Sequence, residues 1–144
     1  MSRRIVITQE DMQKLKKLVD AEIDDAKNKP HVLDLDNELK RAEIVSKDEI
    51  PDDIITMNSV VQLSLDGMDE TITLVYPHET DVDNNMISVL SPIGTAIIGF
   101  REGDVVEWAV PSGITIIDIK KVLYQPEAIE KSALTTAVKK QDKI

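Results

Sequence analysis

Three acidic residues near the end of the first helical stretch are placed where they could act on something outside the chain. Glu22, Asp24 and Asp25 stand just before the turn at Lys29-Pro30. Backbone carbonyls at the C-terminal end of a helix carry partial negative charge, so each acid there costs roughly a few tenths of a kcal/mol. Either this cost is incidental, or the acids face a partner.

Other residue types that support chemistry do not form a recognisable set. His31 and His78 are the only histidines, and neither has a second ligand at metal spacing. The stretch Asp81–Asn85 begins like a calcium loop but lacks the required glycine and the closing glutamate, which favours a polar turn. Ser91 has no histidine at a spacing that suits a hydrolase. The residues alone therefore indicate no active site, no metal and no cofactor.

The composition limits the core and the partners. Hydrophobic residues make up 42% of the chain but aromatics only 3%, so the core must be aliphatic, and the absence of cysteine fits a cytoplasmic protein. The net charge is −10, and residues 51–126 hold 3 basic against 12 acidic residues. Such a segment repels phosphate backbones, so we expect no direct nucleic-acid binding and favour a basic protein surface as partner. No apolar run is long enough for a membrane span or an export signal.

The first 49 residues read as a helical hairpin. Thr8 is a predicted N-cap with Asp11 as the acid of a capping box, and apolar residues then recur at helical spacing to about Lys27. Pro30 ends this helix, and a second amphipathic helix carries Leu35 and Leu39. Two helices joined by a short turn pack antiparallel. The first arm would be roughly 30 Å long at ~1.5 Å per residue.

The rest of the chain reads as a sheet with one short helix. Asp66-Gly67 and Pro111-Ser112-Gly113 are turn signals between alternating or β-branched runs, and "MISVL" is a further strand. Ser91 is suited to cap a short helix with Pro92 at its first position. We predict an α+β protein with a hairpin over 1–49, an antiparallel sheet domain over 50–126, and a tail over 127–144 that is helical or disordered. The four aromatics are expected to pack in the core.

Several motifs occur in an order that resembles a known family. "ISVLSPIGTAIIGFREGDVVEWAVPSGITIIDIKKVLY" is similar to the C-terminal domain of GreA/GreB transcript-cleavage factors. "ELKRAEIV", "IPDDIITMNSVVQL", "TLVYP" and "LYQPE" narrow the resemblance to the Rnk branch, the regulators of nucleoside diphosphate kinase, which are shortened relatives of those factors. The resemblance covers residues 35 to 127, and the first helix matches in architecture more than in letters.

The resemblance implies an N-terminal antiparallel coiled coil, a C-terminal FKBP-like domain, and RNA polymerase as partner. The globular domain would dock at the rim of the polymerase secondary channel, through Ser91, Pro92 and Ile93, and the coiled coil would enter the channel. In the cleavage factors, acids at the coiled-coil tip help hold a magnesium ion; Asp24 and Asp25 stand at that place here. The arms look too short to bring a carboxylate within ~2.1 Å of such an ion, so we expect a regulator that is not an enzyme.

Two other functions stay open at this stage. An active transcript-cleavage factor would use the tip acids Asp24 and Asp25 as a catalytic accessory. A peptide-binding adaptor would never contact polymerase. Prolyl isomerase activity is not expected, because that chemistry uses an aromatic-lined pocket and the chain has few aromatics. The sequence does not indicate the oligomeric state, the genes regulated, or a link to nucleoside diphosphate kinase.

Overall fold

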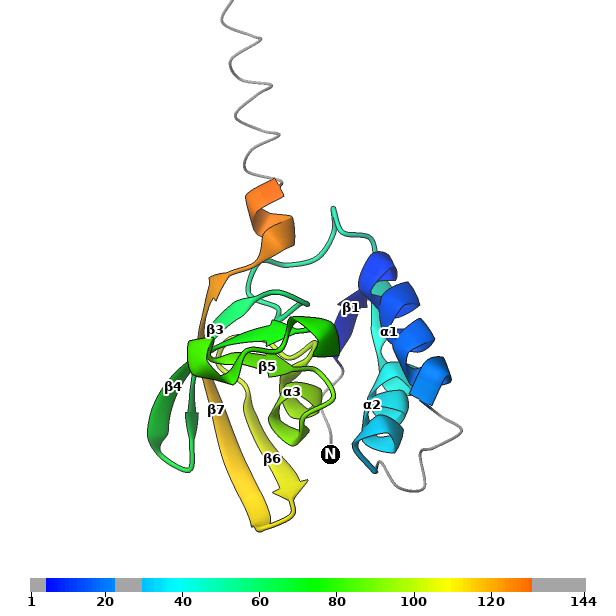
Figure 1. Cartoon of the computed structure of the whole chain (residues 1–144). Helices are drawn as coiled ribbons and strands as arrows, with labels where there is room; N and C mark the ends of the chain where they lie inside the picture. The colour runs from blue at the N-terminus through cyan, green and yellow to red at the C-terminus, as the bar shows by residue number, and fades with distance from the viewer. Residues whose placement is uncertain (1–4, 23–29, 131–144) are drawn as a thin grey trace, which may run out of the picture.

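The chain folds as a helical hairpin packed beside a five-stranded sheet, with a short helix between them (Figure 1). The structure, a computed structural model, describes residues 5–22 and 30–130. This arrangement confirms the predicted α+β class, with an N-terminal helical hairpin and a C-terminal sheet that carries one short helix. The predicted division into 1–49, 50–126 and 127–144 stays a prediction, because buried residues of the hairpin and of the sheet form one shared core.

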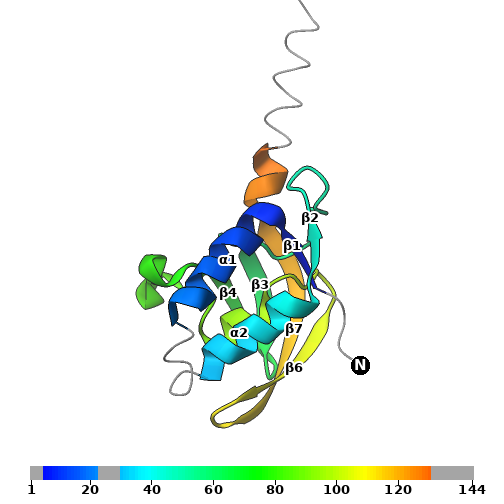
Figure 2. The same cartoon turned by 90° about the vertical axis from the view of Figure 1, so that its right-hand side faces the viewer.

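The hairpin consists of α1 (Gln9–Glu22) and α2 (Pro30–Arg41), which lie side by side (Figure 2). Thr8 caps α1 as predicted, since its hydroxyl accepts a hydrogen bond from the Asp11 amide at 3.1 Å. The predicted extension of this helix to Lys27 falls outside the described residues. The described helices have 14 and 12 residues, or about 21 and 18 Å at ~1.5 Å per residue.

Two short strands that the sequence did not predict flank the hairpin. β1 (Val6–Thr8) precedes α1, and β2 (Glu43–Val45) follows α2; they pair in parallel. The Val6 amide donates to the Gly99 carbonyl at 3.0 Å. Gly99 has φ +80°, and a Cβ there would lie 2.7 Å from the Ile5 Cβ, so only glycine allows this approach. The ends of the hairpin are thereby attached to the body.

The sheet has the order β5-β4-β3-β7-β6. Its strands are β3 (Val60–Leu65), β4 (Met68–Val75), β5 (Met86–Ser88), β6 (Val105–Val110) and β7 (Gly113–Tyr124). The predicted hairpins β3–β4 and β6–β7 are present, and Asp66 and Gly67 both have positive φ, as a tight two-residue turn requires. One detail differs from the predicted antiparallel sheet, because β5 pairs with β4 in parallel. The single-turn helices η2 (Pro77–Glu79) and η3 (Val82–Asn84) connect these two strands.

The helix α3 (Pro92–Ile97) lies between the sheet and the hairpin (Figure 1). It contacts both α2 and β6. Residues 94–100 are all buried. Gly94 sits directly against the preceding strand end, where a Cβ would lie 2.1 Å from the Ser88 carbonyl oxygen. The position of α3, and of any residue at its N-terminus, therefore depends on the absence of a side chain at 94.

The core is aliphatic, as the composition predicted. Its helical part comes from one stripe on each arm of the hairpin, at the three- and four-residue spacing of a coiled-coil seam. These residues are Met12, Leu15, Val19, Val32, Leu35 and Leu39. The sheet and α3 contribute to the same cluster through Val61, Leu63, Leu74, Ile97, Ile98, Ile117 and Ile119. Of the aromatics, Phe100 is buried and Tyr76 and Trp108 are partly buried against the core, whereas Tyr124 is 42% exposed, so its predicted core role is wrong.

A buried carboxylate joins α1 to the body. The sequence predicted that Asp11 would bond back to the start of its own helix; instead its two oxygens accept from the Met57 amide at 3.2 Å and from the Tyr76 hydroxyl at 3.5 Å. Burial is the main cause that raises the pKa of Asp11 from 3.8 to about 6; Glu127 raises it further, while the Met57 bond, Lys14 and Tyr76 lower it. The bonds from Asp11 to Met57 and Tyr76 form a polar joint that fixes the direction of α1 against the body. Because Asp11 is buried, its ionised form is energetically unfavourable.

We predict that Gly94→Ala destabilises the protein by about 3 kcal/mol, since the methyl group would overlap the Ser88 carbonyl and force α3 outward. Urea unfolding followed by circular dichroism measures this change. Gly67→Ala is the control, because a Cβ at 67 meets nothing within 4 Å and costs only the strain of positive φ, about 1 kcal/mol. Equal losses in the two variants would contradict the close packing of α3.

We also predict a pH dependence caused by Asp11. Below about pH 4 the acid is protonated in both the folded and the unfolded state; between pH 4 and 6 the folded state retains a proton that the unfolded state has lost. The stability from this group therefore falls as pH rises from about 4 to about 7, by about 2–3 kcal/mol, and is constant above that range.

The measurement compares the free energy of unfolding of the unmutated protein with that of Asp11→Asn, which cannot titrate at this position. The difference, unmutated minus variant, should fall between pH 4 and 7, because other carboxylates titrate in both proteins and cancel. A difference that does not change with pH would show that Asp11 titrates normally in the folded state.

Candidate functional site

The turn that begins α3 is formed by Ser91, as predicted. Its hydroxyl accepts from the Gly94 amide at 3.0 Å and donates to the Ser88 carbonyl at 2.7 Å. Pro92 occupies the first helical turn, where its missing amide hydrogen leaves no bond unmade. Beneath the turn, Thr95 donates to the Val89 carbonyl at 2.6 Å. These bonds fix the backbone of the turn, so its outer side chains have defined positions.

The predicted docking residues Ser91, Pro92 and Ile93 are brought together and are all partly exposed, whereas the seven residues that follow are buried. Ile93 and the neighbouring Leu90 pack against the core on one side and reach the surface on the other. Leu90 makes this surface apolar at the position just before Ser91. The arrangement is a small apolar patch on a rigid turn, suited to contact with another protein rather than to bond-making chemistry.

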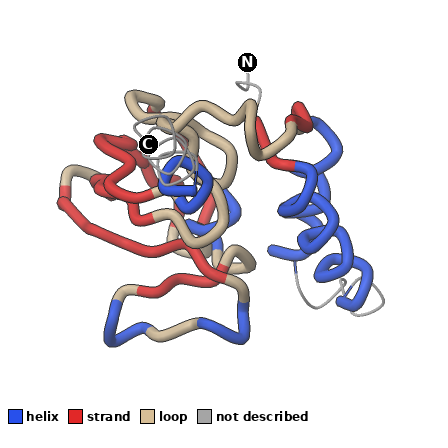
Figure 3. The backbone as a smooth tube through the Cα atoms, turned by 90° about the horizontal axis from the view of Figure 1, so that it is seen from above, coloured by secondary structure: helices blue, strands red, loops and turns tan. Residues whose placement is uncertain are grey.

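The predicted tip residues Asp24 and Asp25 lie outside the described residues. The structure does describe both helices of the hairpin, up to Glu22 in α1 and from Pro30 in α2. Val19, close to the far end of α1, is 2% exposed, and Val32, close to the start of α2, is fully buried. Both belong to the core shared with the sheet. Figure 3 shows the hairpin lying beside the body. Both arms of the described hairpin therefore bury side chains in the core that they share with the body.

A polar junction that the sequence did not predict brings three of the family-like motifs together. In "TMNS", the Thr56 amide donates to the Ser59 hydroxyl at 2.9 Å, and Asn58 takes a left-handed conformation with φ 66°. The Thr56 hydroxyl donates to Glu127 of "QPE" at 2.7 Å. Tyr76 of "LVYP" bonds to Asp11 across from Met57. One indication of this junction was present in the sequence, because its polar residues cluster in short motifs. The motifs do not show which distant residues these side chains contact.

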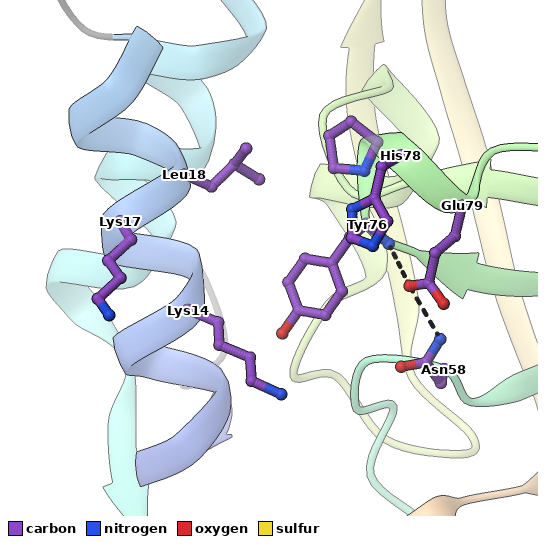
Figure 4. Close-up of a pocket in the computed structure, with 8 residues that line it drawn as sticks. Lys14, Lys17, Leu18, Asn58, Tyr76, His78 and Glu79 are labelled. Atoms are coloured by element: carbon purple, nitrogen blue, oxygen red, sulfur yellow. Dashed lines mark hydrogen bonds between the residues drawn. The ribbon is translucent and has the colours of Figure 1, made fainter.

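A second arrangement, also not predicted, is a cleft of about 550 Å³ between α1 and the turn that follows β4. Figure 4 shows Lys14 and Leu18 pointing from α1 toward Tyr76, which points back at them. The Tyr76 and His78 rings are nearly parallel, at 14°, with centroids 6.2 Å apart. Burial, and after it the Asp11 carboxylate, raises the pKa of Tyr76, so its hydroxyl stays protonated. The cleft combines an aromatic wall with two exposed lysines.

Neither a metal-binding cluster nor a membrane-spanning helix is found among the described residues. Among residues 5–22 and 30–130, no group of three or more His, Asp or Glu side chains is arranged to hold a metal ion. Over the same part of the chain, no helix has the length and apolar character needed to cross a bilayer. His78, one of the two histidines, lies in the cleft wall.

Comparison with known proteins places the chain in a family. Residues 50–124 match the family described as "Transcription elongation factor, GreA/GreB, C-term", and residues 3–45 match "Rnk N-terminus". The first region includes the sheet, α3 and the Ser91 turn, and the second includes the hairpin with its two flanking strands.

Individual relatives agree with these matches. The chain is 41% identical over 97 residues to the regulator of nucleoside diphosphate kinase of Escherichia coli, covering 65% of this chain and 71% of that protein. It is 37% identical over 109 residues to transcription elongation factor GreA of Clostridium botulinum, covering 71% and 68%. A solved GreA/GreB elongation factor from Nitrosomonas europaea superposes with a TM-score of 0.70 at 36% identity, covering 84% of this chain and all of that one.

These findings agree with the resemblance seen in the sequence. They comprise a similar fold, sequence identity to the relatives, and the Rnk match followed along the chain by the GreA/GreB match. The chain belongs to the GreA/GreB family of transcription elongation factors, in the branch whose N-terminal region is that of Rnk.

Proposed function

We propose that the chain is a transcription regulator that binds RNA polymerase and does not itself promote transcript cleavage. The β-rich body docks at the rim of the secondary channel through Ser91, Pro92 and Ile93, and the short hairpin enters the channel. The membership in a family of elongation factors supports the choice of partner.

The rigid turn at α3 supports the docking surface. A contact surface that is already fixed in the free protein loses little conformational entropy when it binds. Ser91 is held by two hydrogen bonds and Gly94 locks the helix behind it, while Pro92 and Ile93 remain accessible. An apolar side chain surrounded by a defined backbone is the kind of residue that contributes strongly at the centre of a protein interface.

The seating of the hairpin supports the absence of cleavage activity. To act on a metal ion in a buried active centre, a carboxylate must approach to ~2.1 Å, so the tip must project well beyond the body. The described arms run about 21 and 18 Å at ~1.5 Å per residue, and both bury their inner stripes in the shared core. This observation carries the proposal that the hairpin occupies a channel without completing its catalytic centre.

The acidic body fits the same partner. Residues 51–126 carry 12 acidic against 3 basic residues, and such a surface associates with basic protein surfaces and avoids direct contact with nucleic acid. A protein placed at the channel rim by an acidic body would contact the enzyme rather than its DNA or RNA.

We predict that Ile93→Glu weakens binding to core RNA polymerase at least tenfold, about 1.4 kcal/mol, because a carboxylate would be desolvated at the docked surface. The affinity is measured by biolayer interferometry with purified core enzyme. Met68→Glu is the matched control, since Met68 is 71% exposed at the far turn of the β3–β4 hairpin and the charge change is the same. Ser91→Ala is less suitable because it also removes a helix cap, costing about 1 kcal/mol.

Unchanged affinity in Ile93→Glu would rule out the proposed docking surface, provided that thermal unfolding shows both variants folded. If core polymerase does not retain the unmutated protein, the result would favour the peptide-binding adaptor instead, because that function involves no contact with polymerase.

A second prediction concerns transcript cleavage. Added to backtracked elongation complexes, the protein should leave transcript lengths unchanged, and it should reduce the cleavage stimulated by a GreA factor by competing for the channel. Denaturing gels of 3′-truncated products measure both effects. If the protein shortens transcripts, and Asp24→Ala combined with Asp25→Ala abolishes the shortening, then the chain is an active cleavage factor.

A further inference from the structure

The cleft between α1 and the turn after β4 has one positively charged side. Lys14 and Lys17 lie three residues apart on α1 and both line the cleft; in Figure 4 Lys14 points toward Tyr76, whereas Lys17 lies on the side of α1 away from that ring. Both are exposed, and neither forms an ion pair with a residue in the described ranges. Each ammonium group offers three hydrogen-bond donors and no acceptor. Two such groups at the edge of a cleft are suited to a phosphate-bearing ligand.

The opposite side of the cleft is flat and aromatic. Tyr76 and His78 present nearly parallel rings, and Pro77 and Leu18 extend the apolar lining. The Tyr76 hydroxyl is used by Asp11, which fixes the direction of the ring. A fixed aromatic ring at the wall of a cleft is a surface on which a planar heterocycle stacks, and stacking on such side chains contributes about 1–3 kcal/mol per nucleic-acid base.

The polar groups on that side are oriented to accept hydrogen bonds. One oxygen of Glu79 accepts from the Tyr76 amide and from the Asn58 side-chain nitrogen, both at 3.4 Å. The backbone N–H of Asn58 donates a 2.6 Å hydrogen bond to the Leu74 carbonyl, which fixes the position of this residue. With its nitrogen used, Asn58 presents its side-chain oxygen toward α1 (Figure 4). The carboxylate of Glu79 can only accept, so this edge favours a ring that carries adjacent N–H donors.

We propose that this cleft binds a guanine nucleotide. The base stacks on Tyr76, its neighbouring ring N–H and amino donors bond to Glu79 and Asn58, and its phosphates lie against Lys14 and Lys17. Among the common bases, guanine has two adjacent donors on its pairing edge, whereas adenine, cytosine and uracil pair each donor with a flanking acceptor. The volume of about 550 Å³ falls within the range of ~300–1,000 Å³ for small-molecule sites.

The electrostatics make the two lysines decisive. The chain carries a net charge of −10, so a phosphate-bearing ligand is repelled by most of the surface and attracted only where ammonium groups are local. Binding should therefore weaken with added salt, because added ions screen the attraction between exposed ammonium groups and phosphates, with a Debye length of about 8 Å at physiological ionic strength. The site lies on α1 and the η2 turn, apart from the proposed docking residues Ser91, Pro92 and Ile93, and ligand binding there can be measured without polymerase.

Isothermal titration calorimetry on the full chain, with GDP as the probe, tests the proposal without polymerase. ADP tests the base, guanosine tests the phosphates, and pyrophosphate tests whether phosphates suffice. The key variant is Lys14→Gln with Lys17→Gln. Its matched control is Lys16→Gln with Lys121→Gln, which removes the same charge at exposed positions outside the cleft. Tyr76→Phe keeps the ring and loses the bond to Asp11, while Glu79→Gln replaces one acceptor by a donor.

We expect GDP to bind with a Kd below about 1 mM and at least fivefold tighter than ADP, guanosine or pyrophosphate. The Lys14/Lys17 variant should bind GDP at least tenfold more weakly and the control variant within twofold. Glu79→Gln should lose the preference for GDP over ADP while remaining folded by circular dichroism, and Tyr76→Phe should retain GDP binding. No heat of binding with GDP, or equal losses in the two lysine pairs, overturns the proposal. Equal affinity for pyrophosphate and GDP overturns it also, since the aromatic wall would then contribute nothing.

Discussion

The burial of one aliphatic stripe from each hairpin arm against α3 and the sheet is the interaction on which the rest of the structure depends. Helices of 14 and 12 residues are marginal in water by themselves, because helix nucleation is costly and propensity alone does not repay it. Leu15, Val19, Val32 and Leu35 are buried in the cluster that the arms share with the body. The hairpin is therefore stabilised by the body, and its position is set by the same contact that stabilises it.

This shared core explains what many of the motif residues do. Arg41 of "ELKRAEIV" pairs with Glu38 through an Nε–oxygen contact of 2.7 Å and lies 5.8 Å from the centre of the Phe100 ring. It thereby joins the end of α2 to the segment that follows α3. The "TMNS" turn supplies the amide that bonds to Asp11. The residues of both motifs thus lie at the contact between the hairpin and the body. The turn at Ser91 to Ile93 differs from them, since it is supported from below and partly open above.

Two surfaces lie near the contact between the hairpin and the body, and their side chains differ in chemical character. The α3 turn presents apolar side chains on a backbone that glycine packing holds in place, which suits a protein partner. The cleft beside α1 exists because the helix approaches the η2 turn without filling the space between them, and it combines ammonium groups with aromatic rings. Because Tyr76 belongs to both the cleft wall and the Asp11 joint, a ligand in the cleft would contact the side chain that fixes α1 to the body.

The sequence determined those features whose cause lies within a few residues. Thr8 and Ser91 cap their helices, and Asp66-Gly67 forms its turn, because the groups that bond are three or fewer positions apart. Helix and strand periodicity gave the fold class, and ordered motifs gave the family. The partners of Asp11, 46 and 65 residues away, were not predictable, nor were the β1–β2 pairing, the parallel β5, the exposed Tyr124 or the cleft. Tertiary structure alone decided these, because a side chain's type limits which bonds it can make, and only the packing of distant segments decides which groups come within reach.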